Sequence, residues 1–240
     1  MKKLLSLILA AMLSLSLVAC GNSADSADNN EGSSVSTESA TSQQEETAQE
    51  EATGETLADW KNDAGWTAFY TFTKNPDLDD AYEAAAEAFG PAIGMDDLDG
   101  NGLKALQVQA AGFEDDISSF TFTDDTMTAL DSEGNKVFSY QYSFVETIEN
   151  AIEGENAYIY KTDSADAEEF TYLCLTLPNV ATEEGGVIQS FNIRHSADDY
   201  EVLATDTYEG SAGVVIDADA PIEDVDYTIR VVYGAQEPNQ

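Results

Sequence analysis

The sequence is poor in the residues on which nucleic-acid binding, soft-metal binding and nucleophilic catalysis depend. It has one histidine, two cysteines and only nine Lys and Arg residues against 47 Asp and Glu, so the formal net charge of the 240 residues is −38. Phosphate backbones are held by clusters of basic side chains, and this charge excludes nucleic acid as a partner. One imidazole and two thiols also leave little for soft-metal or nucleophilic chemistry. The chain does contain 11 Tyr and 10 Phe, and 42% of its residues are hydrophobic, which is enough apolar surface for a folded core.

The N-terminus has the pattern of a secretory signal. Lys2 and Lys3 precede an apolar stretch over residues 4–19, which is shorter than the roughly 20 residues needed to span a bilayer. The stretch ends in Leu17-Val18-Ala19-Cys20-Gly21, which resembles the lipobox of bacterial lipoproteins. This resemblance implies a signal peptide over residues 1–19 and a lipid on Cys20, which would hold the protein on the extracytoplasmic face of the bacterial cell membrane. A plain signal peptide with an incidental cysteine and a transmembrane anchor are the alternatives.

Residues 20–56 are expected to form an acidic, disordered linker. From residue 21 to residue 56 the chain has many acids, no base and no aromatic residue, so it lacks the apolar surface that folding requires. The folded domain is then expected over residues 57–240. If Cys20 carries lipid, Cys174 has no cysteine with which to form an intrachain disulfide. The place of Cys174 in an apolar alternation predicts a small, buried hydrophobic side chain.

The pattern over residues 57–240 predicts a mainly β fold. One helix is expected over residues 76–89, where apolar residues recur at helical spacing until Gly90-Pro91. Alternating apolar and polar residues, separated by turn residues, predict strands over residues 67–73, 117–123, 127–130, 137–145, 157–161, 170–177, 187–193, 213–216 and 227–233. Eight or nine strands at this spacing fit an antiparallel barrel or sandwich.

A series of short motifs runs in order through the first half of this domain, from residue 57 to residue 142. They are Leu57-Ala58-Asp59-Trp60, Gly65-Trp66, Phe69-Tyr70, Leu78-Asp79-Asp80-Ala81-Tyr82-Glu83, Gly112-Phe113, Asp115-Asp116-Ile117, Asp125-Thr126-Met127-Thr128, Gly134-Asn135-Lys136 and Tyr140-Gln141-Tyr142. In this order they resemble the ZinT (YodA) family of extracytoplasmic zinc- and cadmium-binding proteins. The resemblance implies an antiparallel, lipocalin-like (calycin) barrel of about eight strands with one or two short helices. It also implies a non-catalytic protein that captures zinc and passes it to a metal-uptake transporter.

The metal site is where this sequence departs from the family. In the family one His follows a strand, and a His-x-His pair lies on the next strand, where alternate side chains share one face. Matching the sequence to that pattern puts Pro178 at the first position and Ser190 and Asn192 at the pair. His195 is the remaining nitrogen donor, so Ser190, Asn192 and His195 are the candidate ligands of Zn or another divalent cation. Strand alternation points His195 away from the other two, and a surface histidine in an acidic turn is the alternative interpretation.

Residues 97–102 give a second candidate metal site, built from oxygen ligands. Asp97, Asp99 and Asn101 stand at positions one, three and five of an EF-hand-type calcium loop, with Gly102 at position six. Val108 stands at position twelve, where a bidentate acid should close the coordination sphere. A Ca site and a plain Gly-rich turn are therefore both open interpretations.

Two functions follow from these patterns. The first is a lipid-anchored, extracytoplasmic ZinT-like protein that binds a divalent cation, without catalysis, through an altered ligand set. The second is a metal-free β-barrel module that binds a small ligand or a protein partner. No Gly-x-Ser-x-Gly elbow accompanies the single histidine, so we do not expect an enzyme of the Ser-His-Asp type or of another class.

Overall fold

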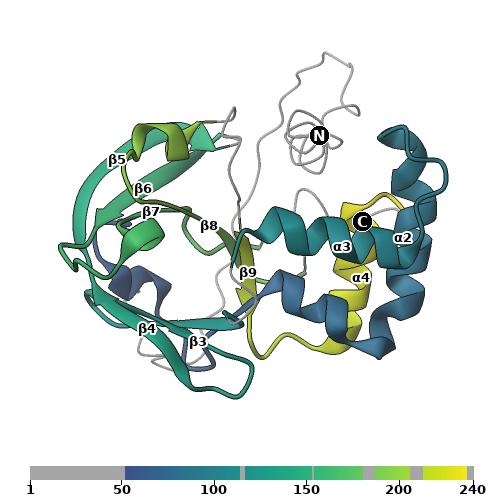
Figure 1. Ribbon diagram of the computed structural model, residues 1–240, viewed down its shortest axis with the longest axis horizontal. Helices are drawn as coiled ribbons and strands as arrows, with labels where there is room; N and C mark the ends of the chain where they lie inside the picture. Colours follow the sequence, from purple (N-terminus) through teal and green to yellow (C-terminus); the bar gives the residue numbers. More distant parts are fainter. Residues whose placement is uncertain (1–51, 114–116, 153, 181–186, 206–212, 237–240) are drawn as a thin grey trace, which may run out of the picture.

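The computed structural model describes residues 52–113, 117–152, 154–180, 187–205 and 213–236. Its main feature is a nine-stranded antiparallel sheet with the strand order β4-β3-β2-β1-β9-β8-β7-β6-β5, which curls into a half-barrel (Figure 1). The strands are β1 (Trp66–Ala68), β2 (Ser119–Phe122), β3 (Thr126–Leu130), β4 (Lys136–Gln141), β5 (Ser143–Ile152), β6 (Glu155–Lys161), β7 (Tyr172–Leu175), β8 (Ser190–Ser196) and β9 (Gly213–Asp217). The prediction of a mainly β, antiparallel, barrel-like fold is confirmed.

The two edge strands of the sheet, β4 and β5, follow each other in the sequence and are joined by Tyr142 alone. Within the described residues β4 pairs only with β3, and β5 pairs only with β6. The Tyr142 amide donates a hydrogen bond to the Asp125 carbonyl at 2.7 Å. The single strand predicted over residues 137–145 is therefore wrong: Tyr142 carries the chain from one edge of the curled sheet to the other.

The inside of the curled sheet is filled by aromatic side chains. Trp60, Trp66 and Phe191 are almost fully buried, and the Trp66 and Phe191 rings lie edge to face with centroids 4.9 Å apart. The indole N–H of Trp66 donates to the Trp60 carbonyl at 2.6 Å, and that of Trp60 donates to the Thr176 carbonyl at 2.8 Å. The polar atoms of both tryptophans are thus satisfied inside the core, which is what buried indoles require.

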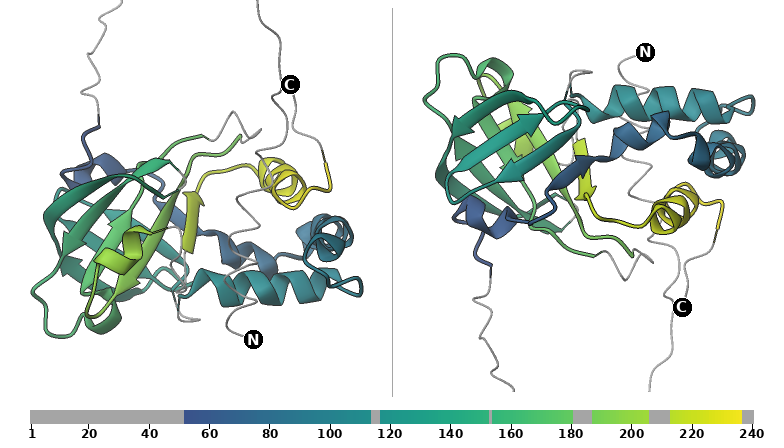
Figure 2. Two further views of the ribbon diagram at one scale, coloured as in Figure 1. Left: turned by 90° about the horizontal axis from the view of Figure 1, so that it is seen from above. Right: turned by 90° about the horizontal axis from the view of Figure 1, so that it is seen from below.

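Three α-helices form a second layer beside β9, on one side of the half-barrel (Figures 1 and 2). They are α2 (Asp79–Ala92), α3 (Gly100–Ala111) and α4 (Ile222–Val232). Their apolar faces share a core with Ile216 of β9 and with Ile188, which lies just before β8. Short 3-10 helices η2 (Leu57–Trp60), η3 (Phe69–Lys74), η4 (Pro76–Leu78), η5 (Glu168–Phe170) and η7 (Glu201–Ala204) connect these elements. Among the described residues, none of the helices has the length and apolar character needed to cross a bilayer.

The predicted helix over residues 76–89 exists, but it ends later than predicted. η4 and α2 together cover residues 76–92, and Gly90-Pro91 lies inside the last turn of α2. The left-handed residue that follows the helix is Gly94, with φ +74°, and not Gly90. Gly90 is needed instead for packing, because a Cβ there would overlap the Met95 carbonyl.

Two other predictions of secondary structure are wrong. The strand predicted over residues 227–233 is part of α4, whose buried residues Val225 and Ile229 are spaced by one helical turn. The strand predicted over residues 67–73 stops at Ala68, and η3 follows it. The helix α3 was not predicted, and the three α-helices in the described part of the chain exceed the one or two that were expected.

Candidate functional site

His195 lies inside the half-barrel, on the opposite face of β8 from Ser190 and Asn192. Phe191 and Ile193 alternate with these two polar residues and belong to the aromatic core. His195 continues the core-facing series and is 9% exposed, while Ser190 and Asn192 are half-buried on the other face. The interpretation of His195 as a surface residue in an acidic turn is wrong, because β8 extends through Ser196.

The imidazole of His195 is stacked against two phenyl rings. The Phe170 ring lies 4.3 Å away at an angle of 23°, and the Phe113 ring lies 6.2 Å away at 20°. Burial lowers the pKa of His195, while the Glu169 carboxylate and backbone hydrogen bonds to Gly112 and Glu169 act in the opposite direction. Burial is the larger effect, so the neutral imidazole is favoured in the folded protein.

The segment that carries Pro178 forms a bulge opposite β8. The Thr176 amide donates to the Asn192 carbonyl at 3.2 Å, and Asn179 forms a bridge with Ser190. Two residues, Leu177 and Pro178, therefore stand opposite the single Phe191. The Asn192 amide also donates to the Thr176 hydroxyl at 3.0 Å. Pro178, Ser190 and Asn192 are thus neighbours along two paired segments, but His195 does not join them.

The calcium-like loop is the start of helix α3. The Asp99 carboxylate accepts a hydrogen bond from the Gly102 amide at 2.7 Å and caps the helix, which begins at Gly100. The Glu83 carboxylate of α2 accepts from the Gly100 amide at 2.9 Å. Asn101 lies in the first helical turn, whereas a calcium loop would need its backbone to wrap around the ion. Among the described residues, no three His, Cys, Asp or Glu side chains are grouped in a way that could hold a metal ion.

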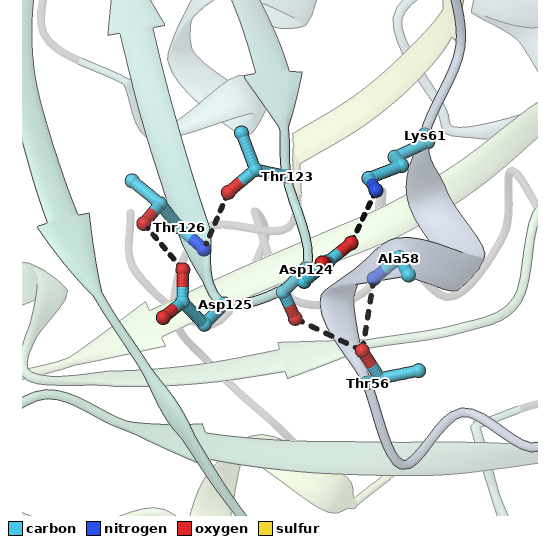
Figure 3. A network of polar contacts seen from close by, with 7 residues as sticks. All are labelled: Thr56, Ala58, Lys61, Thr123, Asp124, Asp125 and Thr126. Atoms are coloured by element: carbon cyan, nitrogen blue, oxygen red, sulfur yellow. Dashed lines mark hydrogen bonds and ion pairs between the residues drawn. The ribbon is translucent and has the colours of Figure 1, made fainter.

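A polar network that the sequence did not reveal ties the N-terminal helix η2 to the turn between β2 and β3 (Figure 3). The Thr56 hydroxyl donates to the Asp124 carbonyl at 2.9 Å, and Lys61 forms an ion pair with the Asp124 carboxylate. Hydrogen bonds from Thr126 and Gln141 lower the pKa of the exposed Asp125. Each of these carboxylates already has protein partners, so the network holds the fold together and leaves no set of free oxygen ligands.

The same N-terminal segment packs against the far side of the half-barrel. The Tyr160 hydroxyl of β6 donates to the Gly54 carbonyl at 2.6 Å. The Trp60 ring contacts the rings of Tyr158 and Tyr160 at centroid distances of 5.9 and 5.8 Å. The contacts of residues 54–61 with β6 and with the β2–β3 turn make this segment a brace between the two halves of the curled sheet.

Comparisons with known proteins give structural likeness alone. No family model and no curated protein matches the chain. The Zn(II)-bound ZinT-like domain of Streptococcus pneumoniae AdcA is 18% identical, with a TM-score of 0.46 over 72% of this chain and 89% of that domain. The Zn(II)-bound AdcA from the same organism is 17% identical, with a TM-score of 0.47 over 72% of this chain and 35% of AdcA. The chain thus spans about a third of AdcA, and a likeness of this size carries no conclusion about family or ligand.

Proposed function

We propose that this protein is a non-catalytic, ZinT-like binding protein that is held outside the cytoplasm by a lipid on Cys20 and that has lost the imidazole zinc centre. The observation that carries the proposal is the geometry of β8. The two residues at the His-x-His positions, Ser190 and Asn192, lie on one face, and the only imidazole lies on the other. Zinc sites in proteins need three or four donors around one point, and a ligand set divided between two faces of a sheet does not meet that need.

In this proposal divalent cations are bound by the many acidic side chains of the protein, without a single coordination site, weakly and with little preference for zinc. The protein has 47 acids and a charge of −38, which raises the local concentration of cations at its surface. Carboxylate and amide oxygens suit calcium and magnesium better than zinc. His195 takes no part in this binding, because its ring is buried and stacked against the rings of Phe113 and Phe170.

Isothermal titration calorimetry of the purified protein with zinc, and separately with calcium, tests this function. We expect weak heats of similar size for both cations, with no stoichiometric zinc binding. A His195→Gln variant serves as the matched control and should give the same zinc isotherm. Tight, one-to-one zinc binding that disappears in the variant would show that the imidazole centre is retained, and the proposal would be wrong.

A metal-free interaction module is the second candidate. The aromatic residues that would line an internal ligand site pack on one another, and Trp60, Trp66, Phe120 and Phe191 are at most 3% exposed. Because these rings fill the interior, a partner of this module would be recognised by its outer surface. Absence of heat with both zinc and calcium would favour this candidate over the oxygen-ligated cation.

The location is tested separately from the ligand. Replacing Cys20 by Ser removes the thiol that would carry the lipid, so the variant should move from the membrane fraction to the soluble extracytoplasmic fraction and lose labelling by radioactive palmitate. A Cys174→Ser variant is the control and should remain in the membrane fraction. If the Cys20 variant still incorporates palmitate, lipidation at this residue is excluded.

A further inference from the structure

The connection between β6 and β7 bridges the open side of the half-barrel. This connection, residues 162–171, is called the strap here, and the Thr162 amide closes its base on the Thr171 carbonyl at 3.0 Å. The Tyr140 hydroxyl of β4 donates to the Asp166 carbonyl at 2.7 Å, and the Tyr142 hydroxyl donates to the Phe170 carbonyl at 2.8 Å. The strap therefore links β4, at one edge of the sheet, to β6 and β7 near the other edge, although β4 and β5 are not paired within the described residues.

On its inner side the strap is held by His195. The Phe170 ring stacks on the imidazole, and the imidazole is also stacked against the ring of Phe113, which follows the C-terminus of α3. The Phe170 ring also lies 4.6 Å from the Phe138 ring of β4. Glu168, the first residue of the short helix η5 that also contains Phe170, has φ +46°. This left-handed conformation is uncommon for a residue other than glycine and is kept only where the surroundings impose it. The strap is thus a strained segment that a few contacts keep in place.

Of the side chains that hold the strap, His195 is the one that can change charge near neutral pH. Burial raises the pKa values of Tyr140 and Tyr142, so both hydroxyls stay neutral donors. The groups around the imidazole include the rings of Phe113 and Phe170, the neighbouring Leu173 of β7, and the backbone of Gly112 and Glu169. The Glu169 carboxylate of the strap is the charged group that acts on His195 and favours the imidazolium, but burial outweighs it.

We propose that the strap is an acid-released closure of the half-barrel: protonation of His195 weakens the Phe170–His195–Phe113 stack, frees the strap, and exposes the aromatic interior. A buried charge packed against two phenyl rings and Leu173 loses more hydration than the Glu169 carboxylate and the backbone hydrogen bonds to Gly112 and Glu169 return. Because the folded protein binds the proton less well than the open form, the closure is complete above the ordinary histidine pKa of about 6.5 and weakens as the pH falls below it. This device does not depend on which ligand the proposed binding function involves.

The single histidine makes the test direct. The ring proton on Cε1 of His195 gives one resonance in an NMR spectrum of the whole protein, and its titration reports protonation without assignment of other residues. Hydrogen–deuterium exchange of the peptides covering residues 162–171 is measured over the range in which histidine changes charge, from about pH 7.5 to about pH 5, and corrected for the intrinsic exchange rate. We expect the protection of the strap to fall severalfold with the same midpoint as the resonance, while peptides of β2 and β3 keep their protection.

Two variants separate this closure from general acid loosening. His195→Gln has no charge at any pH and should abolish the pH dependence of strap protection. Glu169→Gln removes the attraction that favours the imidazolium, so the midpoint should move to lower pH. The proposal is overturned if His195 titrates while the strap keeps its protection, or if the strap of the His195→Gln variant loosens with acid as the wild-type strap does.

Discussion

Asn192 and His195 are three residues apart on β8, and their side chains lie on opposite faces of the sheet. Asn192 shares its face with Ser190, whereas His195 shares the core face with Phe191 and Ile193. An odd spacing along a strand always separates two side chains in this way. On the face where the ZinT pattern has its paired histidines, this chain thus has Ser190 and Asn192. Its one histidine, His195, has not moved along that face but lies on the opposite one.

Histidines placed at the paired positions should create a zinc site. In the Ser190→His, Asn192→His double variant, two imidazoles lie two residues apart on one face, and Pro178→His adds a third from the facing bulge. We expect the triple variant to bind zinc with an affinity of about 1 μM or tighter, measured by calorimetry. Binding should be lost in acid as the imidazoles become protonated.

The matched control for this gain is Asn192→His alone. It gives the protein two histidines, but the new one and His195 lie on opposite faces, so zinc affinity should stay at the wild-type level. An equal gain in the single and triple variants would mean that the two faces of β8 are not separated as described.

The sequence was sufficient to predict most of the strands but not the helices α3 and α4. Alternation over residues 117–123 and 127–130 predicted β2 and β3 because each has one buried and one exposed face. The run from Ile229 to Tyr233 is rich in β-branched residues, which favour strands locally. Packing of Val225 and Ile229 against α2 and its neighbours outweighs that preference.

The candidate site could be predicted only in part, for a physical reason. Alternation placed His195 opposite Ser190 and Asn192 without any structure. Its burial depends on Phe113 and Phe170, which come from segments 82 and 25 residues earlier in the chain (195 − 113 and 195 − 170). Local patterns contain no information about such contacts, and the acids after His195 suggested exposure instead.

The brace formed by residues 54–61 should be essential for stability through Trp60. This side chain is fully buried, contacts Tyr158 and Tyr160, and donates to the Thr176 carbonyl. Trp60→Ala should lower the free energy of unfolding by about 3–5 kcal/mol, measured by urea denaturation. Trp60→Phe keeps a ring but loses the hydrogen bond, and should lower it by about 1–3 kcal/mol.

Lys61→Ala is the control for the brace. Lys61 follows Trp60 directly, and its ion pair with Asp124 is solvent-exposed, with side-chain exposures of 49% and 79%. An exposed ion pair contributes about 1 kcal/mol or less. If Lys61→Ala destabilised the protein as much as Trp60→Ala, the brace would act through its surface charges and not through the buried ring.

Cys174 should not react with thiol reagents in the folded protein. The side chain is fully buried in a cluster with Ile159 and Leu203, and burial raises its pKa to about 12. Only the thiolate reacts with Ellman's reagent, so labelling should occur at the rate of unfolding. A surface cysteine at Val145, introduced into a Cys174→Ala background, is the control and should react at once, since Val145 is 39% exposed.

The same thiol should give the folded protein a sensitivity to alkaline pH. Because the folded-state pKa lies above that of the unfolded chain, the contribution of Cys174 to stability is complete below the unfolded pKa of about 8.5 and is lost as the pH rises above it. The free energy of unfolding should therefore fall between about pH 8.5 and pH 11 more steeply than in Cys174→Ala. Parallel profiles for the two proteins would show that Cys174 is not buried as a neutral thiol.

Gly213, the first residue of β9, should be essential for the position of Phe113 beside His195. A Cβ at residue 213 would overlap the Phe113 ring, so Gly213→Ala should lower the free energy of unfolding by about 1–3 kcal/mol. Adding Phe113→Leu shortens the side chain that is overlapped, and the double variant should be more stable than the sum of the two single changes predicts. Gly134→Ala is the control: it has open space around its Cβ but a φ of +81°, so it should destabilise through the backbone alone, with no coupling to Phe113. Additive effects for residues 213 and 113 would mean that β9 does not press on the ring, and that the stack on His195 is set by the strap alone.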